Sequence, residues 1–124
     1  MTDSQQSLKR LLANGPLTAV PKRPSDQRLL MELAVARFEP GKTYREGDVN
    51  EILKQWIDTF CEPYGIDHVS MRRYLVDARL LARDSAGASY RVAARTERPE
   101  AEPAQVLAEI QRERAQRKDR HLRT

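Results

Sequence analysis

Apolar residues recur at helical spacing along most of this chain, and the clearest run starts at Val49. From there to Phe60, apolar side chains fall at positions i, i+3, i+4, i+7, i+8 and i+11. A continuous stripe of this kind predicts an amphipathic helix with one face in a core, so Trp56 and Phe60 are expected to be buried. Glu46 and Asp48 fall in its first turn, where carboxylates complement the helix dipole.

A helix is predicted on each side of this run. The earlier one is expected over residues 26–38, with Ser25 as its N-cap. The later one is expected to begin after Asp67, whose side chain can cap it. The residues of this later helix that are expected to face inward are Met71, Tyr74, Leu75 and Ala78. Residues 42–44 are too few to form more than a single bridge of strand.

Strand-like runs replace the helical spacing after residue 80. Residues 80–83 and 90–93 flank a small, polar segment that contains Gly87, a pattern typical of a hairpin with a longer loop. The order of elements is therefore helix, short strand, helix, helix and hairpin. This order predicts a mainly α fold with a small β-hairpin, a winged helix-turn-helix.

Further helices are predicted outside this unit. Residues 4–13 carry leucines at helical spacing, and Pro103 is well placed to start a last helix. We therefore expect an N-terminal helix and connector over residues 1–24 and a winged-helix domain over 25–95. A linker and a basic C-terminal helix or arm are expected over 96–124.

Length and composition narrow the class of protein. A chain of 124 residues is one domain with tails, and it holds no apolar run long enough to span a membrane. Its first residues lack the apolar stretch of a signal peptide. The single cysteine, Cys61, excludes an internal disulfide framework, and only His68 and His121 could join it at a zinc site. We therefore expect a cytoplasmic protein without a metal or another cofactor.

The net charge of +4 favours nucleic acid as a partner, but the charge is unevenly distributed. Residues 25–95 hold 11 basic and 11 acidic side chains, so the predicted domain is neutral. Within it, residues 25–66 have a balance of −3 and residues 67–95 a balance of +3, so a phosphate backbone is expected to meet the second half. Six basic residues from Arg112 to Arg123 fit either a solvated helix or an arm that needs a partner.

Several motifs in this order resemble a known family. They are Pro21-Lys22, an apolar helix that ends at Phe38, Tyr44-x-Glu46-x-Asp48-Val49-Asn50, Asp67 followed by Arg72-Arg73-x-Leu75-Val76-Asp77, and Arg83-x-x-x-Gly87-x-x-Tyr90. The pattern resembles an uncharacterised bacterial family, a domain of unknown function that occurs alone or fused behind ArsR-type transcriptional regulators. The resemblance spans about residues 16–93 and implies a regulatory association without a settled activity.

Two positions depart from the pattern of this family. Arg45 stands where a capping threonine or proline is usual, which we expect to weaken the cap of the next helix by about 1 kcal/mol. Ala78-Arg79 stands where the family tends to have a glycine. We expect this second change to tighten or lengthen the preceding helix.

Arg72 and Arg73 are the main candidate functional residues, and each has two interpretations. In the front half of a recognition helix, an arginine can fork onto guanine or hold a phosphate. Alternatively, one of them reaches back to Glu46 or Asp48 in a charge-assisted pair that orients the helices. In the pattern of the resembled family, the acidic residues Glu46 and Asp48 occur together with the arginines, which favours an internal pair. Asp77 is a further candidate for this pair.

The other polar candidates also have two interpretations. Arg83 and Arg91 flank the hairpin, where they could contact a DNA backbone or only keep a strand edge soluble. His68 and Ser70 begin the predicted recognition helix, although a histidine there is more often simply solvated. Asn50 is expected to bond a backbone group in the turn before it rather than a ligand.

The remaining notable side chains are expected to be structural. Tyr44 and Tyr74 fit the core with bonded hydroxyls, and Cys61 fits an inert, half-buried thiol. The sequence holds no Ser, His and acid cluster, no glycine-rich phosphate loop and no paired metal ligands. We therefore expect no enzymatic activity.

Two functions remain as hypotheses. In a DNA-binding or transcription-regulating module, the groove contacts would be His68, Ser70, Arg72 and Arg73, and the backbone contacts Arg83 and Arg91. Such proteins often dimerise, and the apolar positions available for a homodimer are Leu8, Leu11, Leu12, Val106, Leu107 and Ile110. The alternative is a protein-interaction or regulatory module on a winged-helix scaffold without DNA binding, which the neutral domain favours.

Overall fold

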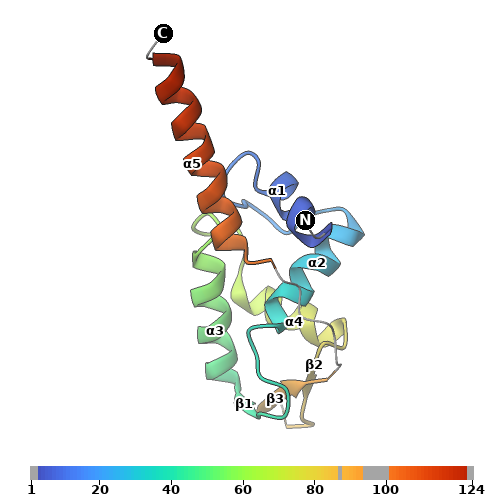
Figure 1. Ribbon diagram of the computed structural model, residues 1–124. Coiled ribbons are helices and arrows are strands. Elements are labelled where there is room, and N and C mark those ends of the chain that lie inside the picture. Colours follow the sequence, from blue (N-terminus) through green and yellow to red (C-terminus); the bar gives the residue numbers. More distant parts are fainter. Residues whose placement is uncertain (1–2, 87, 94–100, 123–124) are drawn as a thin grey trace.

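The computed structural model describes residues 3–86, 88–93 and 101–122 (Figure 1). This part of the chain is mainly helical with a small antiparallel sheet. The helices are α1 (Asp3–Leu11), α2 (Pro24–Val35), α3 (Glu46–Asp58), α4 (His68–Asp77) and α5 (Pro103–Leu122). The strands are β1 (Tyr44–Arg45), β2 (Leu81–Arg83) and β3 (Ser89–Val92). Residues 96–100 of the predicted linker and the hairpin residue Gly87 lie outside the described residues.

The three strands form one sheet in the order β1-β3-β2. The predicted hairpin is confirmed as β2 and β3, with Leu81 opposite Val92. Instead of the single bridge expected at residues 42–44, β1 adds two residues to the free side of β3, and Tyr44 pairs with Tyr90. The sheet therefore joins the segment before α3 to the hairpin after α4.

Tyr44 is buried, and its hydroxyl accepts a hydrogen bond from the Glu39 backbone N–H at 2.8 Å. Its ring meets the edge of Phe38, with centroids 5.1 Å apart and planes at 87°. The prediction of a core tyrosine with a bonded hydroxyl is confirmed at this position.

Helix α2 begins earlier than predicted, so Ser25 is not its N-cap. The first helical residue is Pro24, and the N-cap is Arg23, whose side chain makes no capping bond. Proline suits the first helical position because its ring presets φ and it has no N–H to leave unpaired. The helix also ends before residue 38, at Val35.

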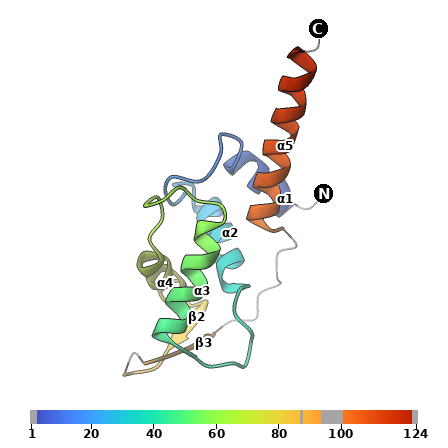
Figure 2. The ribbon, with the colours of Figure 1, turned by 90° about the vertical axis from the view of Figure 1, so that its left-hand side faces the viewer.

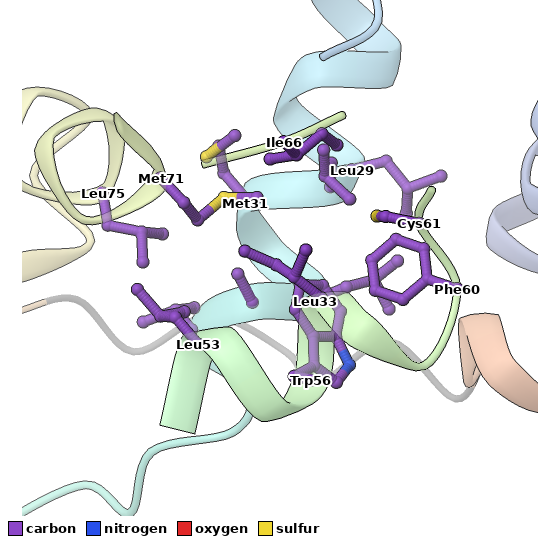
Figure 3. Packing of buried hydrophobic residues seen from close by; sticks show 14 of the residues in the cluster. Leu29, Met31, Leu33, Leu53, Trp56, Phe60, Cys61, Ile66, Met71 and Leu75 are labelled. Carbon is purple, nitrogen blue, oxygen red and sulfur yellow. The ribbon is translucent and has the colours of Figure 1, made fainter. Parts of the chain in front are cut away.

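The core lies between α2, α3 and α4 (Figure 3). Trp56 and Phe60 are buried as predicted, with their ring centroids 4.6 Å apart. On α4, Met71 and Leu75 are fully buried, but the prediction that Tyr74 and Ala78 face inward is wrong. The reason is that α4 packs more extensively on α3 than on α2, which leaves the Tyr74 side of the helix beside solvent.

The flanking helices share this core rather than standing apart from it. Helix α1 packs against α5, and both contribute to one apolar cluster with the rest of the chain. Arg10 of α1 holds the buried carboxylate of Asp26 with two hydrogen bonds, of 2.6 and 3.2 Å. Arg37 after α2 pairs with Glu102 before α5 at 2.8 Å.

This packing changes the expectation for a dimer. Of the six apolar positions assigned to it, the four buried within the single chain are Leu8, Leu12, Val106 and Leu107. The other two, Leu11 and Ile110, are partly buried against the same core. A homodimer stays a prediction, but these positions are already covered by the chain itself.

Candidate nucleic-acid interface

Arg72 is directed into the protein and joins three elements. Its Nη2 lies 3.0 Å from Glu46 Oε1 at the start of α3, and its Nη1 donates to Asn50 Oδ1 one turn later. Its guanidinium also lies over the Tyr90 ring of β3, 6.0 Å from the centroid. Only 12% of the Arg72 side chain is exposed. Two nitrogens of this arginine are therefore used between α4 and α3, and the face of its guanidinium contacts the sheet.

The other members of the predicted ion-pair group take different roles. Asp48 accepts a hydrogen bond from the Arg45 backbone N–H at 3.3 Å and so closes the first turn of α3. Arg45 is the N-cap residue, and its side chain makes no capping bond. The prediction that Asn50 bonds a backbone group is wrong. Asn50 lies one turn after Glu46 on the face of α3 that meets Arg72, and its Oδ1 accepts a hydrogen bond from Arg72 instead. Asp77 is exposed at the end of α4.

The start of α4 is fixed by Asp67, as predicted. Its carboxylate accepts from the backbone N–H groups of Val69 and Ser70, both at 3.3 Å, and from the Ser70 hydroxyl at 3.2 Å. Desolvation by burial raises the pKa of Asp67, but these hydrogen bonds and His68 outweigh it and lower the pKa overall. The His68 side chain is 32% exposed, and its Nδ1 lies 3.8 Å from Asp67 Oδ1. Ser70 therefore takes part in the cap, and His68 lies beside it.

Arg73, unlike Arg72, lies on the solvent-exposed side of α4. It is exposed, and among the described residues it belongs to no ion pair. On a helix, successive residues are about 100° apart, so neighbours in sequence can face a core and the solvent in turn. Ser70 and Asp77 are exposed beside Arg73 on the outer face of α4. The outer face thus has one arginine, one hydroxyl and one carboxylate.

Arg79 is a further exposed cation that the sequence patterns did not single out as a contact. It adopts a left-handed backbone, with φ of 60°. Its N–H bonds Val76 O at 3.0 Å, and the Leu80 N–H bonds Leu75 O at 2.9 Å. These two bonds form a Schellman motif at the end of the helix. Its left-handed residue, here Arg79, stands where glycine is favoured. Ala78-Arg79, where the chain departs from the family pattern, therefore does not lengthen the helix, since α4 ends at Asp77.

Two arginines extend the exposed positive charge onto the hairpin. Arg83 lies opposite Tyr90, and Arg91 lies opposite Ala82. Because opposite residues share a face and successive residues alternate, Arg83 and Arg91 belong to opposite faces of the hairpin. Both are exposed. The turn between them is held by Asp84, which accepts from the Ala88 N–H at 2.8 Å and the Ser89 hydroxyl at 2.9 Å.

An open groove of about 330 Å³ separates α4 from the start of α2. It is lined by Val20, Pro24, Gln27, Arg28, Met31, Tyr74, Asp77 and Ala78. Tyr74 is 48% exposed at its edge. This groove was not expected from the sequence, because the helical spacing of Tyr74 and Ala78 predicted core positions.

Neither a metal site nor a reactive thiol is evident in the described part of the chain. Among those residues, no three His, Cys, Asp or Glu side chains are grouped to hold an ion. Burial, together with the charge of Asp58, raises the pKa of Cys61 to about 12, so its thiol stays protonated near neutral pH. None of the described helices is long and apolar enough to cross a membrane.

A family model described as "Uncharacterized protein conserved in bacteria (DUF2087)" matches residues 16–92, which is more than half of the chain. The chain belongs to the DUF2087 family. The DUF2087 match begins before α2 and ends with β3, so it contains the Arg72 contacts, the outer face of α4 and the hairpin. Helices α1 and α5 lie outside it. No curated protein and no solved structure matches the chain.

Proposed function

We propose that this DUF2087 domain is a winged helix-turn-helix module that binds double-stranded DNA and takes part in transcription regulation. The order of elements supports it: α3, a turn and α4 are followed by the hairpin, and β1 completes the sheet beside β3. In proteins of this class the second helix enters the major groove. Helix α4 would take this place, and the hairpin would be the wing.

The observation that carries the proposal is the division between Arg72 and Arg73. Arg72 fixes α4 against α3 and the sheet, which orients the helix. Arg73 stays exposed on the outer face, where a fork of donors can reach a guanine or a phosphate. A helix that is held in one orientation and keeps an arginine exposed suits binding in a groove.

Five exposed residues would contact the DNA in this arrangement. Ser70 and Arg73 would enter the major groove, and Arg79 would contact a phosphate at the end of α4. Arg83 and Arg91, on the two faces of the hairpin, suit the two walls of a minor groove. Arg72 has no direct contact in this arrangement, in contrast to the sequence-based hypothesis.

Fluorescence anisotropy with a labelled random-sequence duplex tests the proposal. We expect affinity to fall steeply between about 50 and 200 mM salt, because bound cations on the phosphates are released. Replacing Arg73, Arg83 and Arg91 by glutamine should lower the slope of log K against log salt by about 0.9 for each phosphate that the variant no longer neutralises. The proposal is refuted if the wild type does not bind the duplex at micromolar concentration, or if its affinity does not change with salt.

The groove beside Tyr74 supports a second candidate, a protein-interaction module without DNA binding. Tyrosine is enriched at protein interfaces because its ring buries apolar area while its hydroxyl stays bonded. Tyr74, half exposed beside an apolar groove, fits that use. If the wild type fails to bind duplex DNA, the second candidate is favoured. Its own test is whether Tyr74→Ser abolishes capture of a partner that the wild type retains.

A further inference from the structure

The second half of α5 leaves the body of the protein. Val106 and Leu107 in its first half are buried, whereas every residue from 111 to 118 is exposed. Figures 1 and 2, at right angles to each other, both show the end of α5 extending beyond the other helices. We call residues 111–118 the α5 arm.

The excess positive charge of the whole chain is concentrated at this arm. Residues 111–124 hold six basic and two acidic residues, a balance of +4. Residues 1–110 hold 16 of each sign and are neutral. The net charge of the protein is therefore that of one short segment, most of which belongs to the projecting arm.

The basic side chains of the arm are also arranged on one face. Arg114, Arg117 and Lys118 stand at i, i+3 and i+4, so they are neighbours on the helix surface. Like charges at this spacing destabilise an isolated helix. Among the described side chains, the arm has one ion pair, between Glu113 and Arg117 at 3.7 Å, and both members are mostly exposed.

The arm lacks the features of two other kinds of partner. The apolar stripe of α5 stops at Ile110, and the next positions on that seam are Glu113 and Arg117, so a second copy would find no apolar face. A helix that lies on a membrane needs large apolar residues opposite its charges, and residues 111–118 contain none larger than alanine. The remaining feature of the arm is its row of exposed cations, which a partner with a regular row of negative charge would match.

We propose that the α5 arm is a docking site for the phosphate backbone of nucleic acid, with Arg114, Arg117 and Lys118 as its contact face. The contact would be independent of sequence, because phosphates carry no base information. It would also stabilise the arm, since a short helix without packing is marginal in water and phosphates relieve the repulsion between its cations. The arm lies outside the DUF2087 match and does not require α4 to bind DNA.

The test compares two variants of the full chain that carry equal charge changes. In the arm variant, Arg114, Arg117 and Lys118 become glutamine. In the control variant, the exposed Lys22, Arg23 and Lys54 become glutamine. Binding to a labelled random-sequence duplex is measured by anisotropy across a salt series, and circular dichroism checks that both variants keep the wild-type fold and Tm.

We expect the arm variant to lose affinity by about tenfold or more at low salt and the salt slope to fall by about 2–3. The control variant should stay within about twofold of the wild type. Equal losses in the two variants, or an arm variant that binds like the wild type, would overturn the proposal. So would arm-dependent binding to anionic phosphatidylserine vesicles without binding to the duplex.

The variant with Arg73, Arg83 and Arg91 replaced separates this proposal from the proposed function. If that variant binds like the wild type and the arm variant does not, the arm is a docking site and α4 is not the reading helix. The reverse result supports α4 and overturns the arm.

Discussion

The guanidinium of Arg72 lies 3.0 Å from the carboxylate of Glu46, and this pair connects α4 to the first turn of α3. The same arginine donates to Asn50 and covers the ring of Tyr90. One side chain thus links two helices and the sheet. Its neighbour Arg73 makes no ion pair within the described residues and faces solvent.

Arg72→Ala should lower the free energy of unfolding by about 1–3 kcal/mol. Its side chain is 12% exposed, and hydrogen bonds that involve a charged group are worth about this much. Arg72→Lys should recover little, because a lysine cannot present a planar fork to Glu46 and Asn50 together. Urea denaturation measures both changes. A loss below about 0.5 kcal/mol for the alanine variant would show that the Arg72 side chain does not stabilise the fold.

Arg79→Gly should stabilise the protein by about 0.5–1 kcal/mol. Arg79 has φ of 60°, where a side chain is strained, and glycine relieves the strain at some cost in unfolded-state entropy. Ala78→Gly is the matched control. Ala78 has a right-handed backbone with φ of −78°, so the same change there should destabilise the protein. Thermal unfolding of the two variants should give shifts of opposite sign. Two shifts of the same sign would contradict the assignment of Arg79 to a strained C-cap.

Asp67→Ala should cost about 1 kcal/mol at neutral pH, whereas Asp67→Asn should cost only a fraction of that, since asparagine also caps helices. The pKa of Asp67 is lowered in the folded state, so its contribution is present above the unfolded pKa of about 3.9 and is lost as pH falls through the folded pKa. The gap between wild type and Asp67→Ala should therefore narrow in acid. Urea denaturation from pH 7 down to pH 3 follows this gap. A gap that stays constant would exclude the carboxylate as the cap.

Cys61 should react slowly with a thiol reagent at pH 8. Its pKa of about 12 leaves little thiolate, and the higher nucleophilicity of that thiolate offsets only part of the loss. We expect a rate about 30-fold or more below that of the urea-unfolded chain. Absorbance with an aromatic disulfide reagent gives both rates. Equal rates would place the thiol at the surface.

The elements with strong local signals could be predicted from the sequence. The apolar stripe that ends at Phe60 predicted α3, and Asp67 predicted the start of α4, because periodicity and capping are local properties. The acidic residues Glu46 and Asp48 in the first turn of α3 also pointed to an arginine partner. The structure places Arg72 beside Glu46.

Other features depend on how the helices pack and could not be predicted. The rotation of α4 toward α3 exposes Tyr74, although its spacing alone matches the buried Met71 and Leu75. Likewise, the leucines of α1 resembled a free apolar face, but α5 covers them from more than 90 positions away in the chain. Local patterns show which residues are apolar and leave open which partner buries them.

The roles of the two neighbouring arginines are separated by comparing Arg72→Met with Arg73→Met in both stability and duplex DNA binding. We predict that Arg72→Met unfolds at lower urea but, where folded, binds DNA within about twofold of the wild type. Arg73→Met should keep its stability within about 0.5 kcal/mol, as surface changes usually do, and lose affinity together with about 0.9 of salt slope. If Arg73→Met binds as tightly as the wild type, or if Arg72→Met alone loses binding while folded, the division of roles between the two arginines is wrong.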